Sequence, residues 1–324
     1  MPKSKSTLSL VFLGTSELAI PSIERLLKAD HHIERVVVRP ALADDDQAFP
    51  DERLESALGA WAKEKGLDVQ SPDKAGADDF REQIEAMKPD LGVIASYGRR
   101  FPLELLEAPR LGWLKVHFSM LPAYRGQHAI RSAISNGEKT LGVSLIEVVD
   151  QGDTGPLIQQ EEIETHPDQR FGEVAPELAE LGATMLEKAV NTLAAGKKLK
   201  KKKQSERRSP PKAIRFTRRH LQPPWWINAN AVYDRLRALS PEPGLLSLIR
   251  RERVNIISGR PLEWVQPPYG EDGSFLGVRA GRLAILCGES TVFGIERVLL
   301  EDGEALSAPD VARRFDLRAG DRIV

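Results

Sequence analysis

The sequence lacks the features of several protein classes. Its 324 residues include one cysteine, Cys287, which excludes a disulfide framework and a thiolate metal site and is typical of a reducing cytosol. No apolar run approaches the roughly 18 residues of a membrane-spanning helix. The apolar stretch that begins at Leu8 ends at Gly14 and is too short for a secretory signal. We therefore expect a cytoplasmic protein with no leader and no membrane partner.

The glycine fingerprint of dinucleotide-binding proteins is also missing. The turn after the first apolar run reads Leu-Gly-Thr-Ser at residues 13–16. It does not contain the three glycines of G-x-G-x-x-G that let a pyrophosphate approach the backbone. This turn therefore favours a simple strand–helix connection, and a nicotinamide-dependent dehydrogenase is the weakest of the functions considered.

The chain does have enough apolar residues for folded domains, and its charge is unevenly distributed. Hydrophobic residues make up 41% and charged residues 29%, which excludes a disordered chain, and the length favours two domains. Residues 1–190 contain 21 basic and 32 acidic residues, whereas residues 191–324 contain 25 and 15. In residues 197–220, 12 of 24 are Lys or Arg. This division indicates that the second half contacts a polyanion.

Hydrophobic periodicity predicts an α/β domain in residues 1–195. Strands are expected at residues 8–14, 34–38, 90–96, 113–117 and 143–148, and helices at residues 16–28, 54–65, 78–87, 130–135 and 172–193. This alternation predicts a Rossmann-like, mainly parallel sheet with helices on both faces. Ligands of such sheets bind at the carboxyl ends of the strands.

A basic linker, residues 196–222, is expected to lead into a smaller domain, residues 223–324. Short β-like runs at residues 253–257, 275–279, 283–286 and 292–300 are separated by Gly, Asp and Pro, and a short helix is expected at residues 309–315. This pattern predicts a β-rich, barrel-like C-terminal domain.

Two polar residues in the first domain are candidates for acid–base chemistry. His117 ends a predicted strand, and Asp153 lies in the turn after the strand at residues 143–148. We expect this turn to return a carboxylate to the same sheet edge as His117, where it would fix the imidazole tautomer and raise its pKa. A structural histidine and an ordinary Asp/Gly turn remain alternatives. The other histidines have no ligand-like spacing, so we expect no metal site.

Two segments, residues 115–126 and 153–155, are similar to the signature of the folate-dependent formyltransferases. Further segments that support the resemblance are residues 12–15, residues 95–98 with Pro102, residues 141–144 and residues 317–324. The resemblance covers nearly the whole chain and is most specific in the first domain.

The resemblance implies transfer of a formyl group from the co-substrate 10-formyltetrahydrofolate to the amino group of methionyl initiator transfer RNA, by a monomeric enzyme. It matches the family's catalytic histidine to His117, its aspartate to Asp153 and its asparagine to Lys115. The implied folate contacts are Ser119, Met120, Leu121, Pro122, Tyr97 and Gly98. The expected RNA contacts in the basic linker are Lys197, Lys198, Lys200, Lys201, Lys202, Lys203, Arg207 and Arg208.

Lys115 departs from the family's pattern. The asparagine donates a hydrogen bond to the developing oxyanion, and losing such a donor costs about 10²–10³ in rate. Because strand residues alternate, Lys115 and His117 share a face, so the lysine either replaces the donor or impairs catalysis. Two alternatives therefore stay open: transfer to an amino sugar nucleotide or another amine, and a catalytically impaired RNA- or folate-binding paralogue. An acidic segment, residues 44–55, stands where the RNA-acting members have a basic loop, and its role is left open.

Overall fold

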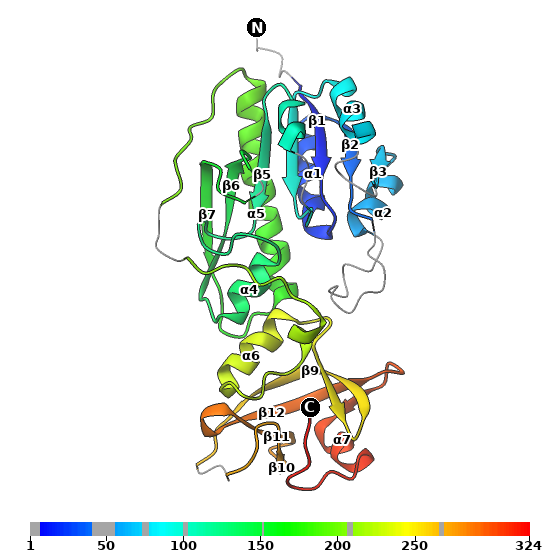
Figure 1. Cartoon of the computed structure of the whole chain (residues 1–324), viewed down its shortest axis with the longest axis vertical. Helices are drawn as coiled ribbons and strands as arrows, with labels where there is room; N and C mark the ends of the chain where they lie inside the picture. Colours follow the sequence, from blue (N-terminus) through cyan, green and yellow to red (C-terminus); the bar gives the residue numbers. More distant parts are fainter. Residues whose placement is uncertain are drawn as a thin grey trace.

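The computed structural model describes residues 7–40, 56–72, 78–99, 103–150, 152–205, 210–265 and 269–324. Residues 44–55, Pro102, Arg207 and Arg208 lie outside these ranges. The chain forms an N-terminal α/β domain and a C-terminal β-rich domain, which are joined by a segment that runs along one side of the first domain (Figure 1).

The N-terminal domain is built on one seven-stranded sheet with the order β3-β2-β1-β4-β5-β6-β7. The strands are β1 (Ser9–Leu13), β2 (His32–Val37), β3 (Val69–Gln70), β4 (Leu91–Ala95), β5 (Trp113–His117), β6 (Thr140–Glu147) and β7 (Leu157–Glu164). The first five strands in this order, β3, β2, β1, β4 and β5, are parallel to one another. Strand β6 is antiparallel to β5, and β7 is antiparallel to β6. The sheet is thus mainly parallel, as expected.

Helices cover both faces of this sheet. They are α1 (Ile20–Lys28), which follows the 3₁₀ turn η1 (Glu17–Ala19), α2 (Ala57–Glu64), α3 (Asp78–Met87), the 3₁₀ turn η3 (Leu103–Glu107), α4 (Ala129–Ser135) and α5 (Phe171–Ala194). Leu10 and Phe12 of β1 pack in one core with α1 and α5. Val11 and Leu13 pack on the opposite face with α3 and η3. This alternation confirms the Rossmann-like fold.

The face of β5 to β7 that lies opposite α5 is covered by loops. Val116 packs in the core that contains α5, so Lys115 and His117 lie on the other face. There Leu121, from the loop after β5, packs with Ile146 of β6 and Leu157 of β7. Polar groups of the loops can therefore meet on this part of the sheet.

The C-terminal domain is an antiparallel sheet with the order β10-β11-β12-β9-β8, and β13 pairs with β12. Its elements are η4 (Arg218–Leu221), α6 (Ala229–Ala238), β8 (Leu245–Ile249), β9 (Glu252–Leu262), β10 (Phe275–Arg279), β11 (Arg282–Cys287), η5 (Gly288–Ser290), β12 (Thr291–Leu300), β13 (Ala305–Ser307) and α7 (Ala308–Arg314). The end of the chain links the two edges, because Ile323 pairs with Ile249 and Arg322 pairs with Ser274. The sheet closes in this way, which confirms the barrel-like expectation.

The two domains are in direct contact through α6, which lies against α4 (Figure 1). Arg131 of α4 is buried, and its Nη1 donates to the Ala238 carbonyl at 2.8 Å. Its guanidinium lies 3.7 Å from the centre of the Phe171 ring. Among the helices in the described ranges, none is long and apolar enough to cross a membrane.

Candidate active site

The carboxyl ends of β1, β4 and β5 are neighbours in the sheet. The Thr15 hydroxyl donates to the Tyr97 carbonyl at 3.0 Å, and the Ser16 and Ser96 hydroxyls are 2.5 Å apart. Tyr97 is buried, burial raises its pKa to about 12, and among the described residues its hydroxyl has no hydrogen-bond partner. The loops after β1 and β4 are thus joined beside the end of β5.

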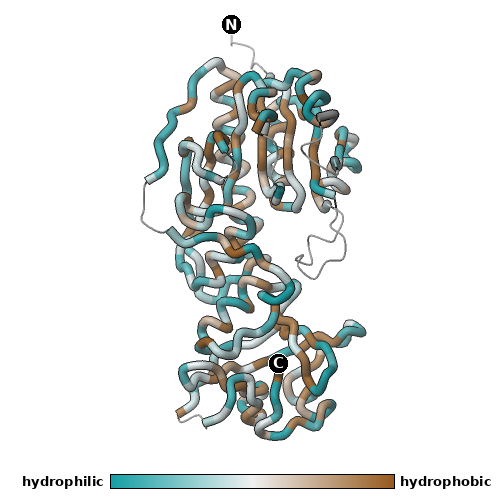
Figure 2. Tube along the Cα trace, in the orientation of Figure 1, coloured by the Kyte–Doolittle hydropathy of each residue, from teal (hydrophilic) through white to brown (hydrophobic). Residues whose placement is uncertain are grey.

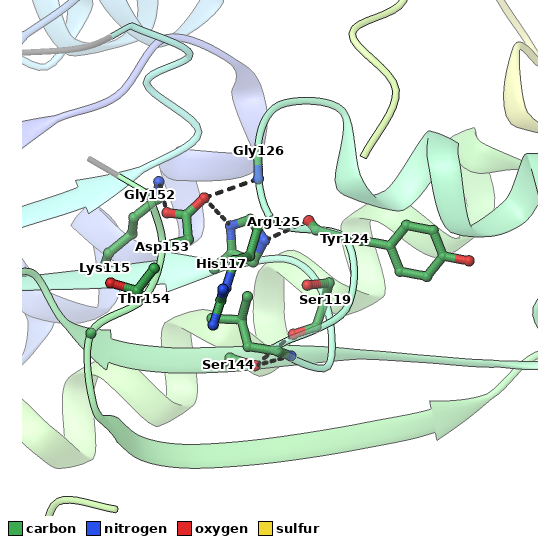
Figure 3. A network of polar contacts seen from close by, with 12 residues as sticks. Lys115, His117, Ser119, Tyr124, Arg125, Gly126, Ser144, Gly152, Asp153 and Thr154 are labelled. Carbon is green, nitrogen blue, oxygen red and sulfur yellow. Dashed lines mark hydrogen bonds and ion pairs between the residues drawn. The ribbon is translucent and has the colours of Figure 1, made fainter. Parts of the chain in front are cut away.

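His117 is the last residue of β5, and its side chain is buried, with 4% of the residue exposed. Its Nε2 is 2.9 Å from the Tyr124 carbonyl oxygen. Because a carbonyl can only accept, Nε2 carries the hydrogen, and the lone pair of the neutral ring is on Nδ1. Nδ1 is 3.7 Å from Oδ2 of Asp153 (Figure 3).

Asp153 is the centre of the polar network in Figure 3, where it lies between the Lys115 side chain and the His117 ring. Its Oδ2 accepts a hydrogen bond from the Gly126 backbone amide at 3.0 Å. Its Oδ1 is 2.5 Å from Nζ of Lys115. One buried carboxylate therefore contacts two side chains of β5 and the backbone of the loop after β5.

The network fixes the charge states of this group of residues. Burial would raise the pKa of Asp153, but the charges of His117 and Lys115 and the hydrogen bonds from Lys115 and Gly126 lower the pKa below its usual value. Burial lowers the pKa of His117, and Lys115 lowers it further, while Asp153 and the Tyr124 carbonyl oppose the shift. At neutral pH the carboxylate is ionised and the imidazole is neutral.

Asp153 reaches His117 by a route that differs from the expected one. Because β6 is antiparallel to β5, Ser144 of β6 lies opposite His117, and Glu147 lies opposite Leu114. The turn after β6 therefore starts at the amino end of β5 and not at the edge where His117 lies. Residues 152–156, on the far side of this turn, lie over the face of β5, which brings the Asp153 carboxylate to the imidazole.

Three residues of the site loops have a left-handed backbone conformation although they are not glycines. They are Ser96, Tyr124 and Asp153, with φ values of 52°, 57° and 56°. This conformation is unfavourable for residues with a side chain and persists where surrounding contacts hold it. Each of these loops is thus held in its conformation by contacts outside itself.

The residues expected to contact folate lie in two loops. Ser119 and Leu121 are buried: the Ser119 hydroxyl donates to the Ala123 carbonyl at 2.7 Å, and Leu121 packs between β6 and β7. Met120 and Pro122 are half-buried, while Gly98 is exposed next to the buried Tyr97. Backbone groups of the loop are also bound within the protein: the Leu121 amide donates to the Ser144 hydroxyl, which donates to the Ser119 carbonyl. The loop is thus held in a fixed shape, with Met120 and Pro122 partly exposed on it.

The basic linker, called the basic segment from here on and described at residues 196–205 and 210–222, is attached to the first domain. Lys197, Lys198 and Lys200 to Lys203 are all exposed, and Figure 2 shows this part of the chain mostly in teal. The backbone of Lys202 exchanges two hydrogen bonds of 2.8 Å with Leu157, and Nζ of Lys201 pairs with Glu147 at 2.8 Å. The lysines thus line the side of the catalytic domain.

Sequence reasoning missed Gln204, which follows these lysines. Its side chain is buried and donates to the carbonyls of Asp153 at 2.7 Å and Gly155 at 2.8 Å. Its Oε1 accepts from Arg125 Nη2 at 2.6 Å. A single glutamine in a charged run has no sequence signal. The Tyr124 carbonyl and the Gly126 amide were also missed because they are backbone groups, although they lie inside the recognised segment.

Comparison with known proteins extends this description to the whole chain. Residues 8–190 match the family described as formyl transferase, and residues 224–316 match formyl transferase, C-terminal domain. Methionyl-tRNA formyltransferases are similar: that of Anaeromyxobacter dehalogenans is 32% identical over 96% of this chain and 99% of its own, and that of Acidobacterium capsulatum is 31% identical over 94% and 96%.

A solved structure has the same fold. The N-formyltransferase from Helicobacter canadensis, in complex with folinic acid and dTDP-3-aminofucose, aligns with a TM-score of 0.62 at 18% identity, over 89% of this chain and 99% of its own. Among the described residues, no group of three or more His, Cys, Asp or Glu side chains could hold a metal ion.

The fold and the site define a two-domain α/β protein with a buried imidazole–carboxylate pair over the face of its central sheet. The matches in both domains show the family to which the chain belongs. The chain belongs to the formyl transferase family.

We predict that Lys115→Asn raises the pKa of His117. Lys115 lowers this pKa through its charge, and its ammonium also donates a hydrogen bond to the Asp153 carboxylate. Without the lysine the carboxylate interacts mainly with the imidazolium and stabilises it. The measurement is an NMR titration of the His117 ring, assigned with a His117→Gln variant. Lys63→Asn in α2 is the control, and a His117 pKa that stays constant or falls in Lys115→Asn contradicts the prediction.

Proposed function

We propose that this protein transfers the formyl group of 10-formyltetrahydrofolate to the amino group of methionyl initiator transfer RNA. The observation that carries the choice of acceptor is the similarity to methionyl-tRNA formyltransferases over 96% of this chain and 99% of the relative, including the C-terminal domain. We also propose that the protein works as a monomer in the cytoplasm, where such an RNA is made and used.

His117 is the proposed general base, and its Nδ1 is the atom that takes the proton. The neutral ring has its lone pair on Nδ1 because Nε2–H donates to the Tyr124 carbonyl. When the acceptor amine attacks the formyl carbon, Nδ1 takes a proton from the amine nitrogen and later returns it to the folate nitrogen that leaves. A neutral resting state supports this role, since a protonated ring could not act as a base.

Asp153 is the proposed partner of the imidazolium. Once Nδ1 is protonated, the ring lies between the Asp153 carboxylate on one side and the Tyr124 carbonyl on the other. Both are acceptors, so each N–H of the imidazolium faces one. The lowered pKa of Asp153 keeps its carboxylate ionised. The transferred proton therefore stays on the imidazole, without passing to Asp153, until it is returned to the folate nitrogen.

Lys115 is the proposed donor to the oxyanion that forms from the formyl oxygen. Its side chain is part-exposed, and Asp153 accepts a hydrogen bond from one of the three N–H groups of its ammonium. The others are available to a negatively charged oxygen that develops near the strand end. The pairing with Asp153 also offsets the repulsion between Lys115 and a protonated His117.

The folate is proposed to bind between the loops after β4 and β5. The buried Tyr97 hydroxyl has no partner among the described residues, and the Gly98 backbone beside it is exposed. Together with Met120 and Pro122 these groups give an apolar wall with a polar group in it, which fits a flat heteroaromatic ring. When bound, the formyl folate supplies the one-carbon unit.

A formylation assay tests the proposed reaction. With 10-formyltetrahydrofolate and methionyl initiator transfer RNA we expect formylmethionyl-tRNA, and we expect His117→Ala to lower kcat by about 10²–10⁴-fold because the general base is lost. His166→Ala, at an exposed histidine, is the control. If the folate is active and no formylmethionyl-tRNA forms, the proposal is wrong; formylation of a dTDP-linked amino sugar instead would identify the other acceptor class.

Substitution of Lys115 distinguishes an active enzyme from an impaired paralogue. If Lys115 donates to the oxyanion, Lys115→Ala should lower kcat by about 10²–10³-fold, and Lys115→Asn, which restores the family's donor, should retain much more activity. The measurement is kcat for the same formyl transfer. An inert wild type that becomes active in Lys115→Asn would show that the lysine blocks catalysis.

The exposed lysines of the basic segment are proposed to contact RNA phosphates, together with Arg207 and Arg208 outside the described residues. For Lys198→Ala combined with Lys200→Ala, we expect weaker transfer-RNA binding and a salt dependence whose slope is reduced by about one for each phosphate that is no longer neutralised. The measurement is the affinity at several salt concentrations. Lys28→Ala, at an exposed lysine of α1, is the control, and equal slopes for all three proteins would exclude this segment as an RNA-binding surface.

A further inference from the structure

The basic segment contacts both loops that meet at Asp153. Before Gln204, the backbone of Lys202 pairs with Leu157 at the start of β7. After it, the Pro211 carbonyl accepts from the Tyr124 amide at 2.6 Å, and the Ala213 amide donates to the Arg125 carbonyl at 3.2 Å. The described residues of the segment are therefore bound by backbone hydrogen bonds, to β7 before Gln204 and to the loop after β5 beyond residue 210.

Within this segment, Gln204 makes the side-chain hydrogen bonds to both loops. It is 6% exposed, and its two amide hydrogens are directed at two carbonyls of one turn, those of Asp153 and Gly155. Its oxygen accepts from Arg125, which belongs to the other loop. All the hydrogen-bonding capacity of the amide except one lone pair is thus used to join the two loops.

The turn that Gln204 holds needs support from outside. Asp153 has φ = 56°, a conformation that a residue with a side chain adopts at a free-energy cost. Its carboxylate must remain within reach of His117 Nδ1 while its carbonyl points the other way, toward the Gln204 amide. The Gly126 amide and Lys115 hold the carboxylate. Within the turn, Asp150 accepts from the Gly152 and Thr154 amides. From outside it, Gln204 donates to the Asp153 and Gly155 carbonyls.

We propose that Gln204 is a positioning residue for the reaction: by fixing the backbone of Asp153 and Gly155 against Arg125, it sets the position of the Asp153 carboxylate relative to His117. The expected effect of Gln204 on kcat rests on the proposed formyl transfer, whereas its effect on the position of Asp153 relative to His117 does not. The segment that carries the RNA-facing lysines is in this way a part of the active site.

Two substitutions test the role of the amide. Gln204→Met keeps the length of the side chain and removes both donors, so we expect kcat to fall by about 10²-fold, because a small displacement of a catalytic group has this cost. We expect KM to stay nearly constant, since Gln204 faces the turn and not a substrate. For Gln204→Glu, we expect the ratio of its kcat to that of the wild type to rise as the pH is lowered. A protonated carboxyl group donates to one of the two carbonyls, whereas a carboxylate repels both.

The control is Gln169→Ala, which removes another glutamine side chain that bonds to the backbone, in this case to the His166 amide far from the site. We expect wild-type kinetics for this variant. The independent readout is the pKa of His117 in Gln204→Met, measured by NMR. It should be lower than in the wild type, because the carboxylate that raises it has moved away.

The outcomes separate the possible explanations. If Gln204→Met lowers only the amount of folded protein, while kcat per folded molecule and the pKa of His117 stay at wild-type values, the residue is structural and the proposal is overturned. A raised His117 pKa overturns it as well. If the wild type transfers no formyl group, the proposed function falls, and the titration of His117 in the same variant still decides the role of Gln204.

Discussion

The site depends on one buried carboxylate that has more than one partner. Removing Asp153 from water is costly unless donors replace the lost hydration, and here the Lys115 ammonium, the Gly126 amide and the His117 ring all face it. Because these groups come from β5 and from the loop after it, while the carboxylate belongs to the loop after β6, Asp153 has its hydrogen-bond partners only when both loops are in place over β5. The geometry of the His117–Asp153 pair is thus a condition for the stability of this part of the domain.

Lysine in the family's asparagine position changes the electrostatics of this arrangement. An amide would leave the ionised carboxylate to interact mainly with the imidazole, whereas the ammonium of Lys115 takes one of its oxygens. The imidazole is consequently easier to keep neutral and harder to protonate. The substitution places the Lys115 side chain against the same carboxylate that faces the imidazole, so two side chains of β5 share one acidic partner.

The sequence predicted those features that depend on local pattern. The bounds of β5 were correct to the residue, and α5 was correct to within one residue at each end, because both have a clear apolar periodicity. Strand β7 was missed because Gln159 to Glu162 give it a polar sequence typical of an edge. Helix α6 was missed because Val232 and Leu236 are its only large aliphatic residues. The family and the fold class were confirmed, while the domain boundaries 1–195, 196–222 and 223–324 stay a prediction.

The pairing of His117 with Asp153 followed from strand-end reasoning and from the resemblance, but the reasoning assumed the wrong path. The turn was expected at the same sheet edge, and the antiparallel direction of β6 puts its start at the opposite one. Direction of a strand is set by long-range packing that periodicity does not report. The contacts of Gln204 could not be predicted for the same reason, since they join segments that are distant in the chain. The Tyr124 carbonyl is close to His117 in the chain, but it is a backbone group and has no sequence signal.

The buried glutamine after the lysine run changes how the two halves of the chain can be separated. Gln204 lies beyond residue 190, where the match to the N-terminal family ends, yet it occupies the interior of the N-terminal domain. A fragment cut after α5, or a chimera joined there with the tail of a relative, would keep all strands of the first sheet but lose the hydrogen bonds that Gln204 donates to the Asp153 and Gly155 carbonyls. The buried interior of the first domain therefore includes a residue that lies beyond the last helix of that domain.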